Sequence, residues 1–157
     1  MSTPRGVALE LDGVFGDTRP LWRDWLASAA PVLGVEPDEL ADDRAAAAVE
    51  LDRRGAGNWR VLLERFCEER APVYVRRDPG SSAALKALRS AGHRLAVFTD
   101  APEPLARVVL SQLGADRRVE LVQAGRDARR HALEALGKDA VVVTTRDELE
   151  RVLREGT

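Results

Sequence analysis

The sequence contains few of the residues on which several common kinds of site depend. It has one cysteine, Cys67, which excludes a disulfide framework and a zinc site built on paired cysteines. Its two histidines, His93 and His131, leave little material for a metal centre or a catalytic triad based on histidine. Lysine occurs only at Lys86 and Lys138, so arginine carries nearly all of the positive charge.

Long apolar runs and a strong excess of charge are also absent. No stretch is apolar enough for a transmembrane helix, and no basic segment followed by an apolar one marks a secretory signal, so we expect a cytoplasmic protein. The formal net charge of -2 gives no electrostatic reason to bind nucleic acid or a membrane surface. A partner must therefore be argued from the candidate sites.

The remaining composition is that of a soluble globular protein, with 45% hydrophobic and 32% charged residues among 157. This length allows one packed core, or a core with a small inserted lobe. Apolar runs predict strands at residues 6–11, 94–99, 119–123 and 140–144. Helical patterns precede or join the later strands, and we expect them to begin at Ser81 or Ser82, at Pro102 and at Asp127. Strands that alternate with helices predict a parallel α/β sheet, a Rossmann-like three-layer sandwich whose ligands bind at the carboxyl ends of the strands.

Between the first two strands, residues 18–77 predict an all-helical insert. Apolar residues recur at helical spacing from Trp22, an alanine-rich helix is expected from Pro37 to Arg54, and Asn58 is expected to cap a third helix. We interpret the tryptophans of this insert as core residues, with a tryptophan that faces a pocket as the open alternative.

Carboxylates gather where the first predicted strand ends, in residues 10–18 with the sequence ELDGVFGDT. Partly buried like charges raise each other's pKa, and they persist mainly where a cation, a proton or a reaction occupies the gap between them. Glu10 and Asp12 are therefore the first candidates for a functional site.

This segment resembles motif I of the haloacid dehalogenase superfamily of phosphohydrolases, which reads Asp-x-Asp-Gly-Val-x-x-Asp-Thr after a hydrophobic strand. Glu10 stands where that family has its nucleophilic aspartate. The residues that match are Asp12, in the position of the general acid/base, and Gly13, Val14, Asp17 and Thr18. The resemblance implies an α/β core formed by residues 1–17 and 78–157, with strand order 4-1-2-3. It also implies that residues 18–77 are a helical cap that closes over the substrate.

The resemblance continues along the chain. Thr99 matches the motif II hydroxyl that holds phosphate, and Asp100 follows it at the end of the same strand. The motif III lysine is missing, and Arg126 is the nearest cation that can replace it. The resemblance thus implies a ligand-contacting set of Gly13, Thr99, Asp100 and Arg126.

Motif IV departs furthest from the family. The aspartates that fix magnesium are replaced by Thr144-Thr145-Arg146-Asp147, and Thr145 with Glu148 has the spacing of a capping box for the last helix. Asp147 is the remaining carboxylate. Glu10, Asp12 and Asp147 would then be the metal ligands that the resemblance implies, with magnesium required only if the protein is active.

Two functions remain open on these residues. The favoured hypothesis is a catalytically inactive or very weak protein of this fold that acts as a ligand-binding or protein-interaction module. The alternative is a divergent magnesium-dependent phosphatase of a small phosphorylated metabolite. In that case Glu10 attacks phosphorus, and Asp12 protonates the leaving oxygen and then activates water. Thr99 and Arg126 hold the phosphoryl oxygens. Dehalogenation is disfavoured because it also needs the missing nucleophilic aspartate.

Overall fold

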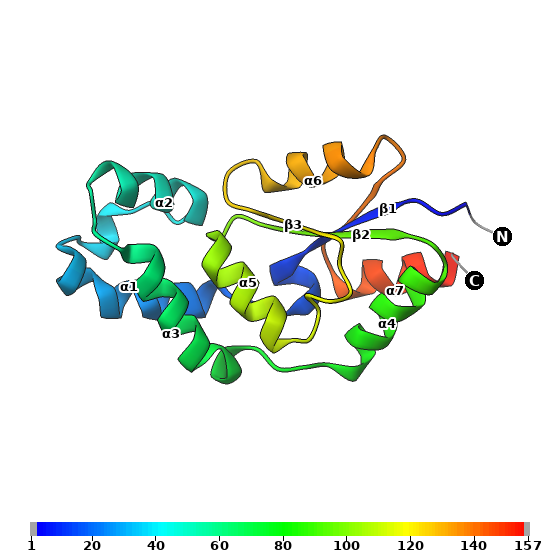
Figure 1. Ribbon diagram of the computed structural model, residues 1–157, viewed down its shortest axis with the longest axis horizontal. Helices are drawn as coiled ribbons and strands as arrows, with labels where there is room; N and C mark the ends of the chain where they lie inside the picture. Colours follow the sequence, from blue (N-terminus) through cyan, green and yellow to red (C-terminus); the bar gives the residue numbers. More distant parts are fainter. Residues whose placement is uncertain (1–2, 156–157) are drawn as a thin grey trace.

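Parallel strands form one sheet in the computed structural model, which describes residues 3–155 (Figure 1). The strands are β1 (Gly6–Glu10), β2 (Arg94–Thr99), β3 (Leu121–Ala124) and β4 (Val141–Val143). Their order, β3-β2-β1-β4, is the predicted 4-1-2-3 order read from the opposite edge, and all pairs are parallel. The predicted Rossmann-like α/β fold is confirmed.

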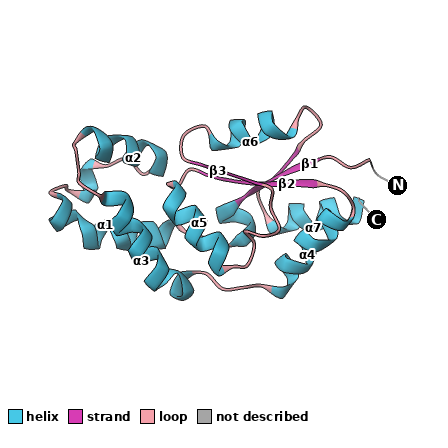
Figure 2. Ribbon diagram, viewed as in Figure 1, coloured by secondary structure: helices cyan, strands magenta, loops and turns pink. Residues whose placement is uncertain are grey.

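Helices cover both faces of this sheet, as Figure 2 shows. One face carries α6 (Ala128–Leu136), and the other carries α4 (Pro79–Ser90), α5 (Glu103–Gln112) and α7 (Arg146–Glu155). The central strands are buried on both sides because neighbouring side chains alternate between the faces. In β1, for example, Val7 and Leu9 join the larger core, whereas Ala8 packs under α6.

Helices make up the segment between β1 and β2, where the sequence predicts an insert. It contains α1 (Arg19–Leu33), the short 3-10 helix η2 (Pro37–Glu39), α2 (Arg44–Arg53) and α3 (Trp59–Tyr74), and α3 packs against α5 (Figure 1). Trp22, Trp25 and Trp59 are buried, with neighbouring ring centroids 5.0 and 6.1 Å apart, so their interpretation as core residues is confirmed. We keep as a proposal the division into a core of residues 1–17 and 78–157 and a cap of residues 18–77. No helix within residues 3–155 has the length and apolar character needed to cross a membrane.

Local capping explains where the elements differ from the sequence prediction. The helix expected from Pro37 to Arg54 is broken, because the Asp43 carboxylate accepts hydrogen bonds from the N–H groups of Ala45 and Ala46 at 2.8 and 3.1 Å. These bonds start α2 at Arg44. The expected strand 6–11 ends at Glu10, because Leu11–Phe15 forms one π-helical turn, η1.

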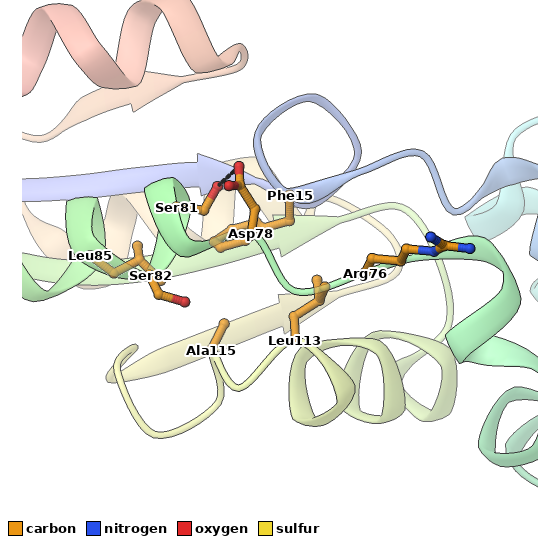
Figure 3. Close-up of a pocket in the computed structure, with 8 residues that line it drawn as sticks. All are labelled: Phe15, Arg76, Asp78, Ser81, Ser82, Leu85, Leu113 and Ala115. Atoms are coloured by element: carbon orange, nitrogen blue, oxygen red, sulfur yellow. Dashed lines mark hydrogen bonds between the residues drawn. The ribbon is translucent and has the colours of Figure 1, made fainter.

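The cap of α4 also differs from the expectation of Ser81 or Ser82. Asp78 is the capping residue, with Pro79 at the first helical position, and its carboxylate accepts from the Gly80 N–H at 3.0 Å. Ser81 instead donates its hydroxyl to Asp78 at 3.2 Å (Figure 3). The cavity beside this cap has a volume of only about 10 Å³, room for one water molecule, so it is no metabolite site (Figure 3).

Candidate functional site

The carboxyl ends of β1 and β2 bring most of the predicted site residues to one cavity of about 500 Å³. Glu10 ends β1, Asp12 lies in η1, and Thr99 ends β2 with Asp100 directly after it. All four line the cavity, together with Arg126 from the loop before α6. Their proximity follows from parallel strands that end at the same edge of the sheet. The roles assigned to them stay predictions.

The guanidinium of Arg44, from the N-terminal end of α2, lies between two of these carboxylates. Its Nη2 donates to Asp100 Oδ1 at 2.7 Å and also bonds the Asp12 carboxylate, and Nε donates to Asp100 Oδ1 at 3.1 Å. The Arg44 backbone N–H donates to Asp100 Oδ2 at 3.0 Å, and Nη1 donates to Thr18 Oγ1 at 2.6 Å. The arginine side chain is only 2% exposed. The insert therefore delivers a buried cation into the acid cluster of the core.

Asp12 is held from its other side by the end of the motif I segment. The Thr18 N–H donates to Asp12 Oδ1 at 2.7 Å, and the Thr18 hydroxyl donates to the same oxygen while it accepts from Arg44. Both carboxylate oxygens of Asp12 are thus in hydrogen bonds, and its side chain is 9% exposed. In this arrangement a ligand that uses Asp12 as an acid or base has to compete with Arg44 and Thr18 for the carboxylate.

Charge and burial set the pKa values of the neighbouring groups in opposite directions. Burial disfavours the charged form of Asp100, but the hydrogen bonds and charge of Arg44 outweigh it and hold the pKa of Asp100 below its usual value. Burial lowers the pKa of Arg44, but the hydrogen bond to Asp100 and the charges of Asp12 and Asp100 raise it above its usual value. Glu10 takes no part in this network. Burial, followed by the nearby charge of Asp12, raises the pKa of Glu10 above 4.5.

Thr99 is buried, and its hydroxyl serves the local backbone. Thr99 Oγ1 accepts from the Ala101 N–H at 3.2 Å and lies 3.5 Å from Arg44 Nη2. The hydroxyl hydrogen can still be donated toward the cavity, since both contacts use Oγ1 as the acceptor.

The end of β4 is occupied by a helix cap. The Thr144 N–H donates to Glu148 Oε2 at 2.8 Å, and the Glu148 N–H donates to Thr145 Oγ1 at 3.1 Å. The predicted cap by Thr145 is present, but Glu148 returns its bond to Thr144 instead of Thr145. Asp147 is exposed in the first turn of α7 and does not line the cavity.

Arg146 points to a different part of the fold. Its Nε donates to the Val14 carbonyl oxygen at 3.2 Å, and its guanidinium pairs with the Asp78 carboxylate. It therefore ties α7 to η1 and to the cap of α4, and it does not fill the cavity.

Magnesium, which the family resemblance implies, does not fit the residues present. Across residues 3–155 no group of three or more His, Cys, Asp or Glu side chains is arranged to hold a metal ion. The Arg44 guanidinium bonds both Asp12 and Asp100, where a cation would need free oxygens. The assignment of Glu10, Asp12 and Asp147 as metal ligands stays a prediction that this geometry does not favour.

The fold requires glycine at position 13 for a reason other than the predicted contact with a ligand. A Cβ atom at Gly13 would lie 1.7 Å from the Thr144 carbonyl oxygen, so only glycine lets η1 pass the end of β4 this closely. Gly13 is not among the residues that line the cavity.

Two arginines of the site were not predicted from the sequence. Arg129, in the first turn of α6, lines the cavity, and its charge lowers the pKa of Glu10 against the larger effect of burial. Arg44 lies in the first turn of α2, where the helix dipole disfavours a cation. That unfavourable position, directly after a capping aspartate, was the one available signal that Arg44 has a partner outside its helix.

The chain is similar over most of its length to one family of hydrolases. The model of the haloacid dehalogenase-like hydrolase family matches residues 13–154. CbbY from Rhodobacter sphaeroides, solved in complex with phosphate, has 18% identity and a TM-score of 0.65 over 89% of this chain and 77% of that one. A HAD phosphatase from Thermococcus onnurineus has 18% identity and a TM-score of 0.53, with coverage of 95% and 97%.

β-Phosphoglucomutase from Clostridium difficile gives a TM-score of 0.62 at 12% identity, over 96% of this chain and 82% of that one. At identities this low, structural likeness shows the fold alone. A search of curated proteins found no match.

Proposed function

The chain belongs to the haloacid dehalogenase-like hydrolase family, and within that family we propose that it binds a small phosphorylated metabolite without magnesium-assisted phosphoryl transfer. One observation carries this proposal. The Arg44 guanidinium is bonded to the carboxylate in the general acid/base position, Asp12, and to Asp100. A substrate that uses Asp12 as its acid or base has to compete with this buried cation for the carboxylate, which disfavours proton transfer.

The group in the nucleophile position also argues against phosphoryl transfer. Glu10 is longer than aspartate by one methylene, and a displacement of about 1 Å can lower a rate roughly 100-fold. Its pKa is raised, first by burial and then by the charge of Asp12, which favours the protonated and less nucleophilic form. Both effects lower the expected rate of phosphoryl transfer independently of the missing metal ligands.

Ligand binding is supported by the shape and charge of the remaining cavity. Its volume of about 500 Å³ is that of a small-molecule site, which favours a metabolite over a protein partner. Arg126 and Arg129 lie at one side of it and can pair with a phosphate, while Glu10 and Thr99 can bond hydroxyl groups. A sugar phosphate fits this combination, and CbbY has been solved with xylulose-1,5-bisphosphate.

The second candidate is the divergent phosphatase. It is supported by the gathering of Glu10, Asp12, Thr99 and Arg126 around one cavity. In that case Arg44 would have to leave Asp12 before each turnover, so removal of Arg44 would raise the rate.

A phosphatase screen with and without magnesium separates the two candidates. Wild type, Glu10→Asp, Asp12→Asn and Arg44→Ala are assayed on triose, pentose and hexose phosphates. We expect no magnesium-dependent turnover by wild type above the Asp12→Asn background. Wild-type turnover that Asp12→Asn abolishes would overturn the proposal.

Calorimetric titration with the same sugar phosphates tests binding directly. Loss of one charge-assisted hydrogen bond should weaken binding about 10-fold in Arg126→Ala and in Arg129→Ala. Arg130→Ala is the matched control, because Arg130 lies on α6 but pairs with Asp127 instead of lining the cavity. Equal weakening in all three variants, or no binding to wild type, contradicts the assignment.

A further inference from the structure

Two core carboxylates face each other at the strand ends in a place where like charges need a cation. Asp12 is 9% exposed, and the side chain of Asp100, at 42%, opens to the cavity. Bringing such groups together costs free energy unless a positive charge lies between them. In this chain that charge is a guanidinium carried by the insert, at hydrogen-bond distance from both carboxylates.

Two sets of contacts fix the position of Arg44, the bonds to Asp100 and the cap of α2 by Asp43. Its backbone N–H and its side chain both bond Asp100, so the start of α2 itself is docked on the end of β2. Asp43 fixes the backbone there by capping α2. The first turn of a helix disfavours a cation, which means that the ion pairs offset a local cost as well as the cost of burial.

We propose that Arg44 is an internal counter-ion that takes the place of a divalent metal in this acid cluster and latches the insert to the core. This inference rests on the proposed function, because it explains why the site does not use magnesium. A guanidinium cannot lose its charge at any ordinary pH and offers a planar fork to carboxylates. The wild-type protein therefore needs no divalent cation to keep Asp12 and Asp100 together.

Removal of the counter-ion should expose a latent preference for metal. Without Arg44, the carboxylates of Asp12 and Asp100 lie close together at the cavity without a cation between them. Carboxylate oxygens are the ligands that magnesium and calcium take in proteins. A divalent ion can then supply the charge that the arginine supplied before.

Thermal unfolding with and without divalent cations tests this directly. The proteins compared are wild type, Arg44→Ala, Arg44→Gln and Arg53→Ala. Arg53 is the matched control, since it lies on the same helix, is 69% exposed and pairs with Glu50. We expect wild type and Arg53→Ala to have the same Tm with or without magnesium.

Arg44→Ala should lower Tm by on the order of 10 °C, because one partner of a buried ion pair is lost. Magnesium or calcium at about 10 mM should then restore roughly 4 °C, the shift given by a Kd near 1 mM. A fall in Tm that no divalent cation reverses would overturn the proposal and leave Arg44 a structural residue only. Equal stabilisation of wild type by magnesium would overturn it as well.

Arg44→Gln keeps most of the side-chain volume and serves if Arg44→Ala does not fold. A direct measurement on wild type adds an independent test. Manganese binding, followed by paramagnetic broadening of backbone amide signals, should leave Gly13, Thr18 and Asp100 unaffected. Selective broadening of those three signals would show that a metal enters beside Arg44 and would refute the replacement. None of these readouts uses catalysis, so their failure is distinct from a positive phosphatase screen.

Discussion

Glu10 differs from Asp12 and Asp100, which line the same cavity, because the hydrogen bonds of Arg44 go to those two carboxylates and not to Glu10. Asp12 and Asp100 each share the guanidinium, whereas Glu10 keeps a raised pKa through burial and the charge of Asp12. The charged form of Glu10 is therefore less stable in the folded state than in the unfolded state. Burial and the charge of Asp12 thus oppose ionisation at this position, a feature that is typical of functional sites.

Glu10→Gln should accordingly stabilise the protein at neutral pH. Because the folded pKa of Glu10 lies above the unfolded value, its contribution to stability is complete at low pH and is lost as pH rises through the folded pKa. The Tm of Glu10→Gln relative to wild type should thus grow as pH rises from about 4 through the folded pKa of Glu10. Glu69→Gln, at an exposed position of α3, controls for the substitution. A Tm difference that shrinks with rising pH would contradict the assignment.

The site residues at the strand ends were predictable from the sequence, whereas Arg44, which the insert contributes, was not. Asp12, Thr99 and Asp100 follow apolar runs, and parallel strands must bring such positions together. Arg44 is remote from them along the chain, and only the docking of α2 places it there. Local pattern carries no information on that docking, which joins Arg44 to Asp100 across 56 positions of the chain.

At the scale of elements, the close passage of η1 along the end of β4 shapes the site. Gly13 lies against the Thr144 carbonyl oxygen, and Thr144 is itself held by Glu148 of α7. The turn that carries Asp12 is thereby fixed between β1 and the first turn of α7. Neither side of this contact can shift without moving the end of a strand.

Gly13→Ala should destabilise the protein by about 2–4 kcal/mol, because the new Cβ would overlap the Thr144 carbonyl oxygen and force the backbone to move. Gly80→Ala is the matched control. There a Cβ meets the Asp78 carboxyl group, with Oδ1 nearest at 3.4 Å, an ordinary contact, so a change within about 0.5 kcal/mol is expected. Urea unfolding of both variants measures the difference, and equal effects at the two positions would contradict the steric argument.

Helix starts were predictable from the sequence where one residue was a clear cap. The prediction was wrong where another residue nearby caps the helix instead. Pro102 and Asp127 lie at the predicted helix starts. Asp43 breaks the alanine-rich stretch because its carboxylate can satisfy two backbone N–H groups, a choice that helix propensity alone does not reveal. Asp78 replaces the serines as the cap of α4, since a proline follows it at the first helical position.

The molecule as a whole has one large core that includes the insert. The same buried cluster contains Leu9 of β1, Trp25 of α1 and Leu105 of α5. A core that is continuous across the predicted boundary of the cap predicts that the insert does not unfold separately. The Arg44 ion pairs at the strand ends act in the same direction.

Urea unfolding of wild type should therefore give one transition by two probes. All three tryptophans lie in the insert, so their fluorescence reports on it, while far-UV circular dichroism reports on the whole chain. We expect the two midpoints to coincide. A fluorescence midpoint at lower urea would show that the insert opens alone.

The buried thiol of Cys67 gives a third probe of the same transition. Burial and the charge of Glu68 raise the pKa of Cys67 to about 12, so a thiol reagent should react with it only in the urea range of global unfolding. Val73→Cys places an exposed cysteine on the same helix and should react at once with the folded protein. Reaction of Cys67 well below the unfolding transition would mean that α3 detaches from α5, and the continuous core would then not hold the insert in place.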